Sequence, residues 1–158
     1  GYLEGKPGPI TTPEGTRVGE HRGLIYYTLG QRNGLNIGGS ATGTGEAWYV
    51  AAKSIPDNRL IVVQGQNHPA LYAHNITVPN VHWISGTCPE LPLKAQARIR
   101  HRQPLANCLV TKTEHGYSIA FEQPQFAPTP GQSLVLYKDG LCLGGGVIDH
   151  SDAPIGSI

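Results

Sequence analysis

The sequence has 158 residues, enough for one ordinary domain or two small ones, and 39% of them are hydrophobic, which suffices for a core. A formal net charge of only +1 excludes a polybasic tail, so any contact with nucleic acid must come from a local basic patch. Glycine (21 residues) and proline (13 residues) make up more than a fifth of the sequence, which favours short strands and turns over helices.

The first half of the sequence predicts a small β-rich domain over residues 1–75. A "PEG" turn joins two short strands within residues 1–20, and a second hairpin pairs 47–54 with 59–65. A short helix is expected from Gly23 to Leu29, although its residues are equally good strand formers. The glycine-rich stretch 37–46 lacks the Lys-Ser/Thr pair and the following helix that phosphate binding requires, so it predicts a flexible surface loop.

The second half predicts a β-barrel over residues 76–158, which makes the fold mostly all-β. Residues 67–75 are expected to form a bridge, followed by strands at 76–84, 94–102, 106–123 and 133–149. The last two runs are hairpins that turn at "EHG" and "KDG". Short strands at this regular spacing, with no helix among them, are typical of a small barrel, in which "LGGG" (143–146) would allow a bulge or a tight corner.

One stretch of the barrel, "KAQARIRHRQ", has a basic or polar side chain at every second position. If the stretch is a strand, these side chains share one face and repeat every ~6.6 Å, a spacing that suits the phosphates of an extended nucleic acid. A solvated strand face, with or without paired carboxylates, explains the same pattern. The alternating residues are Lys94, Gln96, Arg98, Arg100 and Arg102.

No catalytic constellation stands out. Cys108 and Cys142 alternate with leucines and are predicted to be core thiols, whereas Cys88 precedes Pro89 in a loop and has no base nearby. The three cysteines form no CxxC pair and no zinc-like pattern with histidine, so no metal site is predicted, and their sparse, odd number fits a cytoplasmic protein. "DHSD" (149–152) gathers a histidine and two carboxylates, but in what we expect to be a flexible tail.

No signal peptide or membrane-length apolar run is present. Methionine is absent, so we expect the sequence to be part of a longer protein.

Two further polar groups lie in turn-rich segments. Tyr26 and Tyr27 separate His21 and Arg22 from Gln31 and Arg32, and such aromatics beside arginine and glutamine can stack on RNA bases or form a packed domain interface. In the barrel, Pro130-Gly131 suits a type II turn that would leave Gln132 pointing outward.

Taken together, the motifs resemble the C-terminal half of bacterial tRNA-specific 2-thiouridylases. The resemblance runs from Tyr2-Leu3 to Ile148 and rests on the order and spacing of several motifs. These are "GEHRGLIYYTLGQRNGLNIGG", "WYV", "VVQGQNHPALY", "RIRHRQ", "TPGQSLVLY" and "CLGGGVI".

The resemblance implies part of an ATP-dependent sulfurtransferase that makes 2-thiouridine at the wobble position of tRNAs for Lys, Glu and Gln. The family's "SGGVDS"-type ATP loop and its catalytic cysteine segments are not in this sequence. We therefore expect this chain to bind no cofactor and to have no activity alone, whereas the parent protein would use ATP with magnesium. The expected partners are the tRNA anticodon stem-loop, the N-terminal catalytic domain and a sulfur-donor relay protein. The barrel would be similar to the second-domain barrel of translation elongation factors.

The resemblance also points to residues. Arg100, His101 and Gln132 correspond to family positions that contact tRNA, and Arg98, Arg100 and Arg102 would contribute phosphate contacts. His21, Arg22, Gln31 and Arg32 are weaker candidates. His101 replaces the usual family Tyr of "RYRQ", and because histidine gains charge in mildly acidic solution, RNA affinity is expected to depend on pH. The alternative function is a protein-docking module, for a sulfur-relay partner or as an inter-domain scaffold, with little RNA affinity.

Overall fold

The computed structural model describes residues 5–37 and 43–155, and its regular structure is almost entirely β, as predicted. The chain forms two compact units. The first comprises residues up to Tyr72 together with the segment after Asp152, and the second extends from Ala73 to Asp152. Within the described residues, no helix has the length and apolar character needed to cross a membrane.

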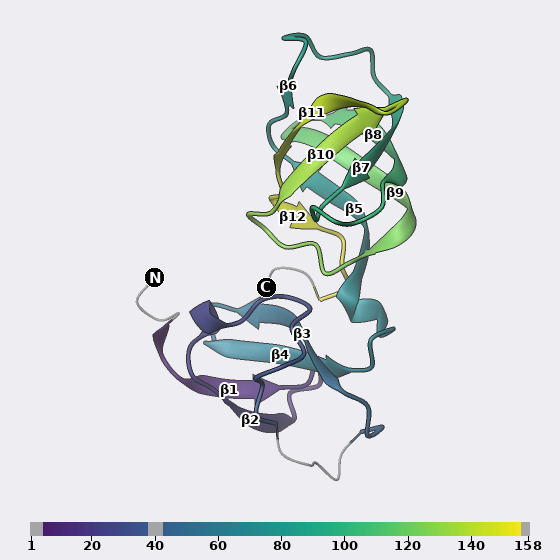
Figure 1. Ribbon diagram of the computed structural model, residues 1–158. Helices are drawn as coiled ribbons and strands as arrows, with labels where there is room; N and C mark the ends of the chain where they lie inside the picture. Colours follow the sequence, from purple (N-terminus) through teal and green to yellow (C-terminus); the bar gives the residue numbers. More distant parts are fainter. Residues whose placement is uncertain (1–4, 38–42, 156–158) are drawn as a thin grey trace. The chain divides into compact units, whose positions relative to one another are not determined.

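The first unit is built on a four-stranded sheet of order β2-β1-β4-β3 (Figure 1). Both predicted hairpins are confirmed, because β1 pairs with β2 and β3 pairs with β4 in antiparallel register, while β1 and β4 run parallel. Gly15, with φ +94°, allows the "PEG" turn to close. The strands are β1 (Gly8–Thr11), β2 (Arg17–His21), β3 (Trp48–Ser54) and β4 (Arg59–Gln64).

The predicted helix at Gly23–Leu29 is a single 3-10 turn, η2 (Leu24–Tyr26). It ends early because Tyr27 returns to extended backbone and is buried, with Leu24, in the core of the first unit. Tertiary packing thus overrides the local helix preference. A second 3-10 turn, η3 (Pro69–Leu71), precedes the barrel. Residues 38–42, which make up half of the predicted glycine-rich loop, lie outside the described residues.

The second unit is an eight-stranded sheet that curls into a barrel-like form (Figure 1). Its strand order is β12-β5-β9-β8-β7-β10-β11-β6. The alternate side chains that face the inside form one core, which includes Ile119, Leu134 and Leu136. The strands are β5 (Tyr72–Val78), β6 (His82–Trp83), β7 (Leu93–Arg98), β8 (Ala106–Thr113), β9 (Gly116–Phe126), β10 (Ser133–Lys138), β11 (Leu141–Val147) and β12 (His150–Ser151).

Several predicted boundaries in the barrel were wrong. The strand expected at 76–84 begins earlier, at Tyr72, and is interrupted after Val78, because Pro79 has no N–H to continue a ladder. The 67–75 bridge is therefore partly strand. The tail 149–152 is not free either, because β12 pairs with β5.

Both predicted hairpin turns are present. Asp139 and Gly140 have φ values of +50° and +80°, the two positive values that a type I′ turn requires. In the glycine run after this turn, a Cβ on Gly144 would collide with the His82 carbonyl and one on Gly146 with the Asn80 carbonyl. These glycines therefore allow β11 to pack closely against β6 and the segment before it.

Candidate nucleic-acid interface

The basic stretch of the barrel is half strand and half turn. Lys94, Gln96 and Arg98 lie on the outward face of β7, as predicted, but β7 ends at Arg98 and the residues after it turn. The turn is closed by Gln103, whose side-chain Oε1 accepts from the Ile99 N–H at 3.0 Å. The prediction that Arg100 and Arg102 continue the strand was therefore wrong, since they lie in the loop that follows it.

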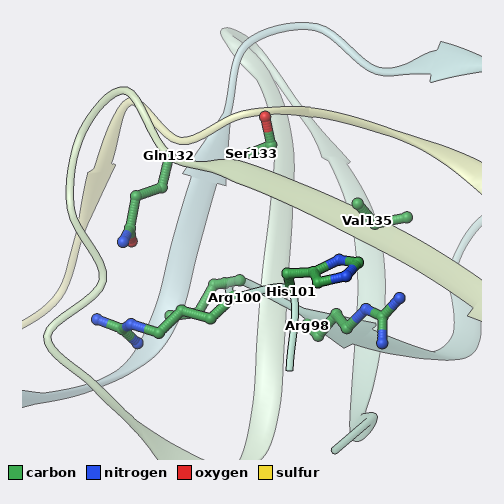
Figure 2. Close-up of a pocket in the computed structure, with 7 residues that line it drawn as sticks. Arg98, Arg100, His101, Gln132, Ser133 and Val135 are labelled. Carbon is green, nitrogen blue, oxygen red and sulfur yellow. The ribbon is translucent and has the colours of Figure 1, made fainter. Parts of the chain in front are cut away.

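This loop helps to form a shallow cavity of about 420 Å³ on the barrel surface. Although about thirty residues separate its two segments in sequence, the pairing of β7 with β10, with Arg98 opposite Val135, brings them together. In Figure 2 the guanidinium groups of Arg98 and Arg100 point to opposite sides, with the His101 ring on the side of Arg98. The residues that line the cavity include Arg98, Arg100, His101, Gln132, Ser133 and Val135.

Arg100 is tied to the barrel by its own guanidinium. One terminal nitrogen donates to the carbonyl of Phe126 at 2.7 Å and the other to the carbonyl of Ala127 at 2.9 Å. The group also lies 5.8 Å from the centroid of the Phe126 ring. Burial lowers the pKa of Arg100 from its ordinary value. Arg100 therefore supports the fold, and only its remaining N–H groups are available to a ligand.

Arg98 is held by a residue that the sequence analysis did not single out. Its guanidinium donates to the hydroxyl of Tyr137 at 3.1 Å and lies 5.3 Å from the centroid of that ring. Tyr137 occupies an alternate position in "SLVLYK", two residues after the outward-facing Val135, and this periodicity could have identified it.

Gln132 and the exposed residues of the loop differ in how firmly they are held. The turn before Gln132 has the predicted features, with a positive φ at Gly131 and a hydrogen bond from the Gln132 N–H to the Thr129 carbonyl. The Gln132 Oε1 accepts from the Thr129 N–H at 3.0 Å, so the amide NH₂ remains to donate. His101 and Arg102 are exposed at the tip of the loop, and Arg102 does not line the cavity.

The three arginines of this region are not neutralised within the barrel. Among residues 5–37 and 43–155, no salt bridge involves Arg98, Arg100 or Arg102. This observation removes carboxylate pairing as the explanation of the basic stretch, whereas a solvated surface remains an alternative to a binding site. What the arrangement offers is positive charge, amide donors and an imidazole around a hollow, which suits an anionic, hydrogen-bonding ligand.

The weaker candidates lie in the first unit, and His21 does not belong among them. It is fully buried, with Nε2 2.7 Å from the Asn58 carbonyl and Nδ1 accepting from the Gly23 N–H. Gln31 uses its amide within its own loop, accepting from Thr28 and donating to Asn33. Arg22 and Arg32 remain exposed, with the Arg22 guanidinium 4.6 Å from the centroid of the Tyr26 ring.

The cysteines offer little nucleophilic chemistry. Burial, and secondarily the negative charge of Glu122, raises the pKa of Cys108 to about 11, so its thiol stays protonated near neutral pH. Cys142 is only half-buried, less than a core position implies, and Cys88 is exposed as predicted. Asp152, in the "DHSD" segment, accepts hydrogen bonds from the backbone N–H groups of His74 and Asn75, which gives it a structural role.

Comparison with known protein families gives one match in each of the two compact units. Residues 1–64 match the family described as tRNA methyl transferase PRC-barrel domain, and residues 73–148 match the aminomethyltransferase beta-barrel domain. The two matched models thus describe barrel domains, one of them named for a tRNA methyl transferase.

The relatives are more specific. The chain is 49% identical, over 95% of its length, to the tRNA-specific 2-thiouridylase MnmA of Burkholderia vietnamiensis. It is 48% identical over 96% of its length to that of Ralstonia nicotianae, and 45% identical over 96% to that of Nitrosococcus oceani. The chain belongs to the tRNA-specific 2-thiouridylase family and spans 41–42% of the length of these three relatives.

Proposed function

We propose that this chain is the tRNA-binding portion of a 2-thiouridylase that acts on the wobble uridine of tRNAs for Lys, Glu and Gln. The observation that carries the proposal is the cavity that Arg98, Arg100, His101 and Gln132 line together. Arginine, histidine and amide side chains are the groups that contact phosphates and unpaired bases in RNA. The ligand that we assign to this cavity is the anticodon stem-loop.

The residues in and near the cavity would make different kinds of contact with the RNA. Arg98 would contact phosphate, with its guanidinium held by Tyr137, and the exposed Arg102 would do so from the loop outside the cavity. His101 would stack on a base, and Gln132 would donate its free amide hydrogens to a base or ribose. Arg100 would act mainly by fixing the loop that presents its neighbours.

The chemistry of sulfur transfer is assigned to the part of the relatives that this chain does not span. ATP with magnesium, the persulfide cysteines and the sulfur-donor relay partner would all act there. The buried Cys108 and the absence of an "SGGVDS"-type loop from this sequence support that division. Incubated alone with tRNA, ATP, magnesium and a sulfide source, the chain would form no 2-thiouridine detectable by mass spectrometry of the digested RNA.

The decisive test is a titration of the chain with a labelled anticodon stem-loop at several salt concentrations. Each phosphate contact contributes about 0.7 to 0.9 to the slope of log affinity against log salt. Arg98→Ala and Arg102→Ala should each weaken binding and flatten that slope. The control is Arg17→Ala, which removes an exposed arginine of the first unit that is paired with Glu20. No saturable binding at low salt would refute the proposal.

A protein-docking role is the second candidate. It is favoured by two exposed apolar side chains near the β11 and β6 edge of the barrel, Ile84 (62% exposed) and Leu141 (69% exposed), and by the near-neutral net charge. If the stem-loop does not bind, this surface becomes the better account of the barrel.

A further inference from the structure

A second hollow, of about 340 Å³, lies beside the first on the barrel surface. The two are connected through paired strands, because Ser133 and Val135 of the first hollow lie opposite Val147 and Gly145 of the second. The residues of the second hollow that matter here are Pro79, Asn80, His82, Gly145, Val147 and Asp149.

The strand register places the two hollows along one row of the sheet. Arg98 lies opposite Val135, Val135 opposite Gly145, and Gly145 opposite His82. Neighbouring strands are ~4.8 Å apart, so His82 lies within about 14 Å of Arg98, a distance that a few nucleotides span. A single RNA loop can therefore reach both hollows.

The chemistry of the second hollow differs from that of the first. No arginine or lysine lines it, and it contains the Asp149 carboxylate, one oxygen of which is 2.9 Å from Nδ1 of His150. A phosphate placed here would meet the Asp149 carboxylate and no arginine or lysine. The hollow consequently disfavours the RNA backbone.

The same groups suit a nucleobase. His82 and Asn80 are exposed, and within the described parts of the chain their side chains form no hydrogen bond. An imidazole ring can stack on a base, and an amide can pair with a base edge. Pro79 and Val147, the latter 54% exposed, supply apolar surface, and the free oxygen of Asp149 can accept from an exocyclic amino group, as carboxylates do with cytosine.

We propose that this second hollow binds an unpaired, amino-bearing nucleobase of the RNA whose phosphates are held at the first hollow. The inference rests on the proposed function and extends it from phosphate contacts to the recognition of one base. Stacking of His82 on the base and hydrogen bonds from Asn80 and to Asp149 would provide that recognition.

The test combines protein variants with abasic RNA. Anticodon stem-loops that carry one abasic nucleotide at each successive loop position are titrated against the wild-type chain, His82→Ala and Asn80→Ala. We expect one abasic position to weaken wild-type binding by at least about fivefold, the lower end of base-stacking effects. The same position should have little further effect in His82→Ala, because the two changes remove one interaction. His115→Ala, which alters an exposed histidine of the β8–β9 turn, is the matched control.

The outcomes separate this inference from the proposed function. Since His82→Ala removes a base contact, it should leave the salt slope unchanged, whereas Arg98→Ala should lower it. If the stem-loop binds in a salt-dependent way but no abasic position couples to His82 or Asn80, the base site is refuted and the phosphate site stands. If the wild-type chain does not bind the stem-loop at all, both are refuted.

Discussion

The guanidinium of Arg98 donates a hydrogen bond to the hydroxyl of Tyr137 across the paired strands β7 and β10, with an N–O distance of 3.1 Å. The contact joins the basic end of β7 to a strand almost forty residues further along the chain. It fixes one of the two arginine side chains that line the cavity while leaving other guanidinium N–H groups free.

Tyr137→Phe should release Arg98 while retaining the ring. A net hydrogen bond of this kind contributes about 1 kcal/mol, so we expect a small loss of stability and a two- to fivefold loss of affinity for the stem-loop. Fluorescence anisotropy and urea denaturation measure the two effects. Unchanged affinity would show that RNA binding does not require this orientation of Arg98.

Arg100→Ala should destabilise the barrel. The variant leaves the carbonyls of Phe126 and Ala127 without their charged donor. Because the site is half-exposed, we expect the free energy of unfolding to fall by only about 1 to 2 kcal/mol. Urea unfolding followed by Trp83 fluorescence, in a Trp48→Phe background, reports on the second unit. Arg102→Ala is the control, with an expected change within about 0.5 kcal/mol. Equal stabilities of the two variants would contradict a structural role for Arg100.

The thiols should differ strongly in reactivity. Because burial and then Glu122 raise the pKa of Cys108 to about 11, its thiolate is scarce at pH 8, whereas Cys88 is exposed. Titration of the folded chain with a chromogenic disulfide should show a fast phase of one thiol that is lost in Cys88→Ser. Persistence of that phase in Cys88→Ser would place the reactive thiol elsewhere and contradict the assignment.

Asp152 should contribute to stability in a pH-dependent manner. Burial alone would raise the pKa of Asp152, but hydrogen bonds from Asn75 and His74 outweigh it and hold the pKa below its ordinary value of 3.8. A lowered folded-state pKa stabilises the fold above the unfolded-state value and loses that contribution as the pH falls through the folded-state value.

The difference in unfolding free energy between wild type and Asp152→Asn should therefore be constant above about pH 5 and shrink below about pH 3.8. Because Asp152 is exposed, we expect a difference of about 1 kcal/mol or less at neutral pH. Asp139→Asn, in the exposed β10–β11 turn, is the control. A difference that does not change with pH would contradict the role of the Asp152 charge.

The sequence by itself determined the features that depend on neighbouring residues. Alternation of side chains predicted most strands of both units, and Asp139-Gly140 predicted its hairpin turn, because period and turn chemistry act over a few residues. The order and spacing of the motifs also predicted the family. The same reasoning placed the end of β7 too late. The alternation of basic residues continues into the loop, but the Gln103 side chain closes a turn at Ile99.

Only the tertiary structure decided which polar residues are available to a ligand. His21 and Arg100 looked like surface candidates in the sequence, but one is buried against Asn58 and the other donates to carbonyls 26 and 27 residues away. Likewise, nothing local places His82 on the same row as Arg98. Strand pairing creates that row, and since pairing joins residues distant in sequence, local pattern cannot specify it.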